Sequence, residues 1–436
     1  MKRLLLLALP TFGQMVAEPV FVLIDTAIVG HVSDTALAGL SLGSTILLTA
    51  VGLCVFLAYS TTSQVAHLFG SGKRREGLQK GFDSIWLSLC IGIVLMFILF
   101  LGARALCAAL GGSGEVLEQA TLYARTAVLG IPGMLVVYAA NGIFRGLQKI
   151  SITLLVAVGG AALNTVLDVL LVIVWGWGVA GSGIATAIAQ WFMGITLLAK
   201  AIYSAQHEGA SIRPHIANIV ASGGEGFPLF LRTLALRIAL LATVMTATAA
   251  GTEVLAGYQI VYVSWSFALN ILDATAIAGQ TLVGAELGAG NYDRARAVTG
   301  ISSRFGLIAG TGVGICFVLA ALVAAPLFSP NPAIQKLATI GMVTVGIAFP
   351  LQGWMWTLDG ILIGAGDFCY LARAMTLVAI IHVVISGVLI LFVMPTLPND
   401  SFKTLALWLA FDIVLMGGRG IANGFRIRKN SWMQHA

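Results

Sequence analysis

The chain matches itself at a constant offset of 218 residues, and this repeat limits its fold more than any other feature. Most of the repeated residues are glycine and proline, which determine where helices bend and where they pack closely. The gapless matches include Pro10 with Pro228, Gly39 with Gly257, Gly70 with Gly288, Gly72 with Gly290, Pro132 with Pro350, Gly142 with Gly360 and Gly146 with Gly364. A half repeated around a shared interface is the architecture of secondary transporters.

The composition places both halves in a membrane. Of the 436 residues, 58% are hydrophobic and 10% are charged, whereas a soluble domain carries about 25% charged residues. A transmembrane helix needs roughly 20 apolar residues. Segments of that kind lie near 4–32, 37–69, 81–111, 117–145, 150–175, 179–205, 223–250, 254–287, 296–328, 333–364, 368–395 and 402–427. The sequence therefore predicts an all-α polytopic membrane protein with twelve transmembrane helices in two pseudo-symmetric lobes of six.

One polar connection separates the predicted lobes. Ser, His, Glu, Arg and Pro gather between the sixth and seventh spans. We predict an N-terminal lobe over 1–206, a cytoplasmic linker over 207–224 and a C-terminal lobe over 225–436. Met1-Lys2-Arg3 and the apolar run after it resemble a signal peptide. Because that run continues to Val32, we predict a first helix that is retained.

Basic residues predict the orientation of the helices. Most lysines and arginines, including Lys73, Arg145, Arg294 and Arg428, fall in connections or chain ends on one side. Short loops rich in such residues stay in the cytoplasm. Both termini are therefore expected to be cytoplasmic, in the plasma membrane of a prokaryote. The net charge of +6 is explained by this topology, and no nucleic-acid partner is expected.

Two short motifs match enzyme or nucleotide sites in spacing alone. Gly39-Leu40-Ser41-Leu42-Gly43 has the spacing of a hydrolase nucleophile elbow, which requires a preceding strand, yet it lies in an apolar helix. Gly70-Ser71-Gly72-Lys73 resembles a phosphate loop, but His67 stands where that loop needs glycine. We predict no cofactor, no ATP site and no catalytic residues. Uphill transport would then draw on an ion gradient.

Two carboxylates lie in the middle of predicted spans. Asp25 is in the first span, and Asp168 is in the fifth, on the same helix face as Asn164. A carboxylate at the bilayer centre costs about 2.5–3.5 kcal/mol, and neither helix places a basic residue nearby. Burial and mutual repulsion penalise the charged form, which lets such carboxyls exchange a proton near neutral pH. The alternative is a structural role, in which each merely bonds Asn164 or a neighbouring helix.

These carboxylates lie in segments that resemble the multidrug and toxic compound extrusion (MATE) family. The segments that resemble its first, fifth and sixth helices are Leu9-Pro10 with 23–31 (LIDTAIVGH), 164–168 (NTVLD) and 176–186 (GWGVAGSGIAT). The segments that are similar to its DinF branch are 359–365 (DGILIGA) and 407–410 (LWLA). The resemblance covers nearly the whole chain.

The resemblance implies a twelve-helix antiporter with a cation-coupling site inside the N-terminal lobe. The residues that match this site are Asp25, Asn141, Asn164, Asp168 and Thr186, with Tyr123 nearby. Phe21 stands where a further tyrosine is expected, so one hydrogen-bond donor is absent. Two carboxylates, two amides and a hydroxyl suit H⁺ or Na⁺, and no other metal is expected. Pro10 matches a proline proposed to gate transport by bending the first helix.

The second half lacks this set of residues. The offset carries Asp25 onto Thr243, Asn164 onto His382 and Asp168 onto Ser386, so ion coupling is expected to be asymmetric. The other charges in its spans are Arg232, Arg237, Asp273, Asp359, Arg373, Asp412 and Arg419. Both signs are present, which favours interhelical pairing. Asp273 and Asp359 are kept as candidate substrate contacts.

The expected function is cation-coupled export of lipophilic, cationic drugs or toxic compounds by alternating access. Anionic groups and aromatic residues such as Trp265 and Trp354 favour lipophilic cations. The alternative in the same superfamily is a flippase for lipids or lipid-linked oligosaccharides, which usually lines its cavity with cationic side chains. An intramembrane enzyme would need a nucleophile–base or metal constellation, and the sequence offers none. We expect a monomer whose partners are lipophilic small molecules and membrane lipid.

Overall fold

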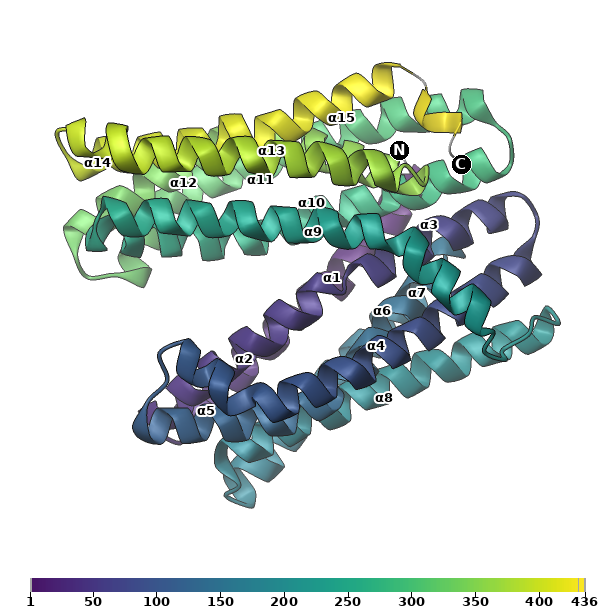
Figure 1. Cartoon of the computed structure of the whole chain (residues 1–436), viewed down its shortest axis with the longest axis horizontal. Helices are drawn as coiled ribbons and strands as arrows, with labels where there is room; N and C mark the ends of the chain where they lie inside the picture. The colour runs from purple at the N-terminus through teal and green to yellow at the C-terminus, as the bar shows by residue number, and fades with distance from the viewer. Residues whose placement is uncertain (1, 430, 435–436) are drawn as a thin grey trace. The chain divides into compact units, whose positions relative to one another are not determined.

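The computed structural model describes the backbone of residues 2–429 and 431–434, and the side chains of these except residues 2, 3, 18, 21, 324, 325 and 434. The described part is built from helices, and 12 helical segments are long and apolar enough to cross a membrane. The prediction of an all-α protein with twelve transmembrane helices is therefore confirmed (Figure 1).

The first six spans contain short breaks that the sequence pattern does not show. Their elements are α1 (Lys2–Gly30), α2 (Asp34–Leu53), α3 (Phe56–Gly70), α4 (Arg74–Ala109), α5 (Gly114–Ala127), the 3₁₀ turn η1 (Val128–Gly130), α6 (Ile131–Gly146), α7 (Ile150–Asp168), the π-helical turn η2 (Val169–Val174) and α8 (Gly178–His207). The second span is thus made of α2 and α3, and the fourth of α5, η1 and α6.

The last six spans follow the same order. Their elements are α9 (Ile216–Ala250), α10 (Thr252–Gly288), α11 (Tyr292–Phe328), α12 (Pro332–Gly364), α13 (Phe368–Val388), η3 (Leu389–Val393), η4 (Met394–Thr396), α14 (Asp400–Leu409), η5 (Ala410–Gly417) and α15 (Gly418–Arg428), with the short turn η6 (Ser431–Gln434) at the end. The segments η3 and η5 are π-helical. The π-helical turns η2 and η3 both follow the fifth helix of their half, so the repeat extends to this irregular feature.

The chain divides into two compact units. One comprises residues 13–227, and the other comprises residues 1–12 and 228–436. Helices α1 and α9 each pass from one unit to the other, two residues after Pro10 and directly before Pro228. These two prolines are equivalent in the repeat. The connection between α8 and α9 covers only residues 208–215, because the expected linker residues 216–224 form the first turns of α9.

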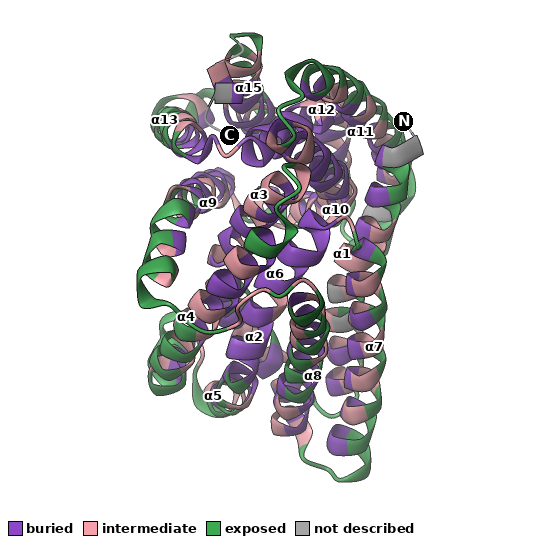
Figure 2. Cartoon of the chain, turned by 90° about the vertical axis from the view of Figure 1, so that its right-hand side faces the viewer, coloured by how far each residue is buried: buried purple, intermediate pink, exposed green. Residues whose placement is uncertain are grey.

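Glycines hold α6 close to its neighbours in the unit of residues 13–227. Helix α6 is buried along nearly its whole length (Figure 2), and it packs against α3 and α4. A Cβ atom on Gly142 would lie 2.6 Å from Thr61 Cβ, and one on Gly146 would lie 2.7 Å from Val65 Cβ. Such small residues allow helix backbones to approach closely in a membrane. The GxxxG spacing here serves packing.

We predict that Gly142→Leu destabilises the protein by about 1–3 kcal/mol, because the added side chain overpacks the contact between α3 and α6. The apparent melting temperature of the detergent-purified protein measures this effect. Gly159→Leu on α7 is the matched control, since a Cβ atom there meets only Phe192, at 3.8 Å. Equal melting of the two variants would contradict the packing role of Gly142.

Candidate functional site

A buried polar cluster connects α1, α7 and α8 in the unit of residues 13–227. The Asn164 side-chain amide nitrogen donates to Asp25 Oδ1 at 2.5 Å and to Asp168 Oδ2 at 2.8 Å. The Thr186 hydroxyl donates to Asp25 Oδ2 at 3.4 Å. None of these four side chains is more than 4% exposed. Four of the residues expected at the cation-coupling site therefore lie together.

The glycine-rich start of α8 brings Thr186 to this cluster. Gly176 and Gly178 have φ values of 67° and 56°, a conformation that favours glycine. A Cβ atom on Gly181 would lie 2.9 Å from the carbonyl carbon of Leu171 in η2. Helix α8 can therefore pack directly against the π-helical turn that follows Asp168. Turns of this kind are frequent at functional sites.

The two carboxyl groups share an environment without a cation. None of the ion pairs in the described part of the chain involves Asp25 or Asp168. The two groups lie close together, because the same amide nitrogen of Asn164 donates to an oxygen of each. Because both partners of the Asn164 amide nitrogen are carboxylate oxygens, the orientation of the amide is determined by the network. One negative charge of the pair can be neutralised by a proton or by a small cation.

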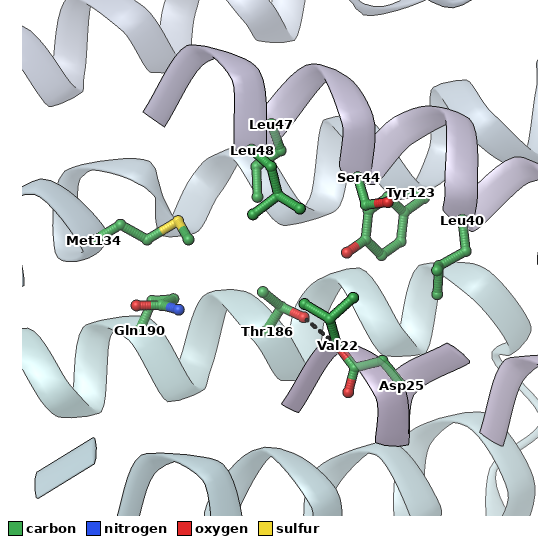
Figure 3. A pocket seen from close by; sticks show the side chains of 10 residues that line it. All are labelled: Val22, Asp25, Leu40, Ser44, Leu47, Leu48, Tyr123, Met134, Thr186 and Gln190. Atoms are coloured by element: carbon green, nitrogen blue, oxygen red, sulfur yellow. Dashed lines mark hydrogen bonds between the residues drawn. The ribbon is translucent and has the colours of Figure 1, made fainter. Parts of the chain in front are cut away.

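A small cavity adjoins Asp25. Its volume is about 30 Å³, and Tyr123, Thr186, Gln190 and Met134 also line it (Figure 3). A water molecule needs at least roughly 10–15 Å³ of such space, whereas drug-sized ligands occupy roughly 300–1,000 Å³. The cavity therefore has room for water or a small ion beside the carboxylate.

The remaining candidate residues make no hydrogen bond to the two carboxylates in the described part of the chain. Tyr123 lines the cavity. Asn141 on α6 is 5% exposed, and its Oδ1 atom has no hydrogen-bond partner among the described residues. Pro10 lies within α1, and the Phe21 side chain is outside the described residues. Within the described residues, no hydrogen bond joins Asn141 to Asp25 or Asp168. Its expected membership of the site therefore stays a prediction.

Two further polar residues of α8, Gln190 and Ser182, are not among those predicted from the sequence. Gln190 lines the cavity with Thr186, and Ser182 is buried beside Asp168. Ser182, Thr186 and Gln190 follow one another at intervals of four residues on α8. Polar residues at that spacing share one face of a helix, and this pattern would have identified all three.

The repeat places a different pair at the equivalent position of the second half. Thr243 Oγ1 lies 2.9 Å from His382 Nε2. The Thr243 hydroxyl also lies 3.1 Å from the Ala239 carbonyl oxygen, within its own helix. The contact spans 139 residues of sequence, as does the contact between Asp25 and Asn164. The same geometry thus recurs without its carboxylates.

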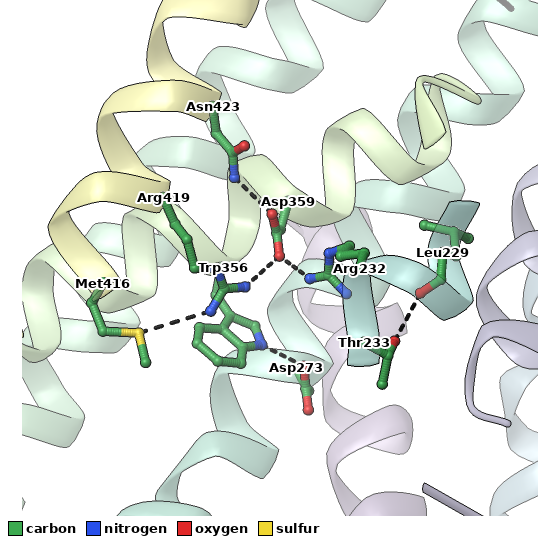
Figure 4. A network of polar contacts seen from close by, with 9 residues as sticks. All are labelled: Leu229, Arg232, Thr233, Asp273, Trp356, Asp359, Met416, Arg419 and Asn423. Atoms are coloured by element: carbon green, nitrogen blue, oxygen red, sulfur yellow. Dashed lines mark hydrogen bonds and ion pairs between the residues drawn. The ribbon is translucent and has the colours of Figure 1, made fainter. Parts of the chain in front are cut away.

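A buried ionic network replaces them elsewhere in the second half (Figure 4). The Asp359 carboxylate accepts from Arg232, from Arg419 at 2.6 Å and from Asn423 at 2.7 Å. The Arg419 guanidinium also lies 4.5 Å from the centre of the Trp356 ring, and Trp356 donates to Asp273 at 2.5 Å. These contacts agree with the expected interhelical pairing. The role of Asp273 and Asp359 as substrate contacts stays a prediction.

Asp412 differs from the expected pairing. It is 5% exposed in the π-helical turn η5, and its Oδ1 atom accepts from the Gln352 side chain at 2.9 Å. Gln352 in turn accepts from Trp265 at 2.9 Å. Within the described residues, Asp412 has no ion pair and its Oδ2 atom has no hydrogen-bond partner. An amide and an indole therefore position this carboxyl.

We predict that Asp359→Asn destabilises the protein by about 3–5 kcal/mol, because it leaves Arg232 and Arg419 buried without their counter-charge. Thermal unfolding of the purified protein measures the loss. Asp293→Asn is the control, since Asp293 is 98% exposed in its pair with Arg296 and should change little. An Asp359→Asn protein that melts like wild type but no longer transports would favour the substrate-contact role instead.

Comparisons with known proteins agree with this architecture. A family model described as MatE matches residues 10–170 and again residues 228–388, so both ends of the two matches are 218 residues apart. Protein DETOXIFICATION 44, chloroplastic, from Arabidopsis thaliana is 29% identical over 441 residues, which cover 98% of this chain and 82% of that protein. DNA damage-inducible protein F from Escherichia coli (strain K12) is 27% identical over 435 residues, which cover 95% of this chain and 89% of that protein.

A solved structure supports the fold. The crystal structure of the Vibrio cholerae MATE transporter VcmN in the bent form has a TM-score of 0.86 and 18% identity, with 99% of this chain and 98% of that chain covered. The two matches of the family model confirm both the internal repeat and the resemblance found in the sequence. The chain belongs to the MatE family, whose members are membrane transporters and not enzymes.

Proposed function

We propose that this protein is a cation-coupled antiporter that exports lipophilic, cationic drugs or toxic compounds across the inner membrane by alternating access. The observation that carries the proposal is the pair of buried carboxyls, Asp25 and Asp168, held by the single amide group of Asn164. Membership of an extrusion family supports export. The coupling ion is H⁺ or Na⁺, and both chain termini face the cytoplasm.

The chemistry of the cluster supports exchange of a cation. Two buried carboxylates without a basic partner repel each other, so binding of one positive charge is favourable. In this conformation the Asn164 amide directs its nitrogen to both carboxylates. Because an amide nitrogen does not ligate Na⁺, this arrangement favours a proton over Na⁺ as the coupling ion. The Oδ1 atoms of Asn141, Asn164 and Asp168 have no partner among the described residues. These oxygens could serve as ligands for Na⁺ after a rotation of the Asn164 amide.

Helix α1 would transmit the binding event. Proline removes a backbone hydrogen bond and permits a kink, and Pro10 lies on the same helix as Asp25. The division between the two units falls two residues after Pro10. An ion can shift the equilibrium between a straight and a bent α1 only if it binds one shape more tightly than the other. Each tenfold difference in affinity shifts that equilibrium by about 1.4 kcal/mol. We therefore assign gating to a bend of α1 at Pro10.

The substrate would bind outside the small cavity at Asp25, because about 30 Å³ cannot hold a drug. Asp273, next to Trp356, combines a carboxylate with an aromatic face and is our candidate for contact with a cation. Asp359 is a weaker candidate, because Arg232, Arg419 and Asn423 already occupy its oxygens. The same carboxylate neutralises Arg232 and Arg419, so these arginines are not available to bind a phosphate group. This pairing argues against the flippase alternative, whose substrates carry phosphate.

We predict that Asp25→Asn reduces drug export to background while the protein folds and inserts normally, because an amide keeps the volume but cannot exchange a proton. Efflux by purified protein in liposomes, driven separately by a proton gradient and by a sodium gradient, measures the effect and identifies the ion. Asp34→Asn, at the exposed first turn of α2, is the control. Normal export by a well-folded Asp25→Asn protein would refute the coupling site.

The gating proposal predicts a pH-dependent shape of α1. Spin labels at Leu6 and Leu23, which are 63% and 64% exposed, should report different distances at low and high pH in a variant without its native cysteines. Asp25→Asn and Pro10→Ala should each abolish the difference, the first by removing the titrating group and the second by restoring a regular helix. An identical distance at both pH values in the parent protein would place coupling in rigid-body motion instead.

A further inference from the structure

A groove in the second half has no role in the proposed ion cycle. Its volume is about 560 Å³, and its lining residues come from α11, α12, α15 and, through Trp432, η6. The helices α11, α12 and α15 are labelled in Figure 1. Helix α12 packs against both α11 and α15. Trp354 and Leu358 of α12 line the groove together with Thr299 of α11 and Phe425 of α15. A groove of this size can hold a ligand as large as a drug molecule.

Glycines keep the groove open. A Cβ atom on Gly300 would meet no atom within 4 Å, so this position faces empty space. On the other side, a Cβ atom on Gly424 would lie 2.9 Å from Trp354 Cη2. The indole therefore lies directly on the backbone of α15 at this position.

The groove has a basic end and an apolar side. Arg296 lies in the second turn of α11, and Arg428 is the last residue of α15, so both charges are at the membrane end of their spans. The lining contains no acidic residue, and the pair of Arg296 with Asp293 is solvent-exposed. Further into the span, Ile421 and Phe425 line the groove and are 68% and 61% exposed. This polarity matches a molecule with an anionic head and an apolar tail.

An unsatisfied hydroxyl marks the same place. Thr299 lines the groove, is 7% exposed, and its Oγ1 atom has no hydrogen-bond partner among the described residues. Nearly all buried polar groups in proteins have a partner. A hydroxyl that is buried, unpartnered and adjacent to a basic groove can donate to an oxygen of a bound ligand.

We propose that this groove binds an anionic phospholipid of the cytoplasmic leaflet. The phosphate group lies between Arg296 and Arg428 and accepts from the Thr299 hydroxyl, while an acyl chain follows Trp354 and Phe425. Basic pockets between membrane helices on the cytoplasmic side recognise lipid headgroups in this way. The two arginines repel the cationic substrates proposed for the transporter, so the groove is a lipid site and not a second substrate site.

The charge of the site is tested by native mass spectrometry of the purified protein with phosphatidylglycerol or phosphatidylcholine. We expect phosphatidylglycerol to bind more tightly. Arg296→Gln and Arg428→Gln should each weaken its binding about fivefold, as expected for one basic residue near a lipid surface. Arg294→Gln is the matched control, because this exposed arginine lies on the same turn but does not line the groove. Equal binding of both lipids, or equal loss in the control, would overturn the proposal.

The shape of the site is tested by filling it. Gly300→Leu should abolish tight binding of phosphatidylglycerol with both arginines in place. Gly312→Leu on the same helix is the control, since a Cβ atom there also meets nothing within 4 Å and Gly312 does not line the groove. Unchanged binding by Gly300→Leu, or full displacement of the lipid by inorganic phosphate, would exclude a lipid groove. Asp25→Asn should bind the lipid normally, which keeps this test independent of ion coupling.

Discussion

Two buried carboxyl groups without a basic partner are the constraint on which the N-terminal half depends. Asp25 and Asp168 tolerate each other because the Asn164 amide donates to both. Their burial requires α1, α7 and α8 to converge, and the small residue Gly181 and the π-helical turn after Asp168 provide that approach. The resulting cluster is stable only with a compensating positive charge or a proton. The ion exchange that we propose rests on that imbalance.

The second half has no carboxylate pair at the equivalent positions, and its core is packed differently there. Three positions that line the small cavity, Leu40, Leu47 and Gln190, correspond by the repeat to Tyr258, Trp265 and Trp408. All three aromatic side chains are at most 2% exposed, and the Tyr258 and Trp408 rings stack with their centroids 5.3 Å apart. Aromatic packing thus occupies the positions that border a cavity in the first half, and Thr243 with His382 replaces the carboxylate pair.

The two halves also differ in how they treat buried charge. Asp359 is neutralised by Arg232 and Arg419, so we expect it to act as a structural ion pair. Asp412 instead depends on the neutral Gln352 and the Trp265 indole. At the membrane end of the same half, Arg296 and Arg428 remain exposed beside an apolar groove. The Asp359 charge is therefore paired in the core, whereas the two arginines at the margin are available to a ligand, where the penalty for an unpaired charge is smaller.

Local periodicity and the repeat determined the twelve spans, the two equivalent halves and the shared face of Asn164 and Asp168, because each is a property of neighbouring residues or of one constant offset. Only the tertiary structure decided that Asp25 bonds Asn164, 139 residues away in the sequence, and that Asn141 makes no hydrogen bond to either residue in the described part of the chain. It also showed that residues 216–224, predicted as linker, belong to α9. The breaks at Cys54 and Val128 and the glycine-walled groove were likewise absent from the pattern. Contacts between distant helices depend on packing and backbone irregularity, which hydrophobic spacing does not encode.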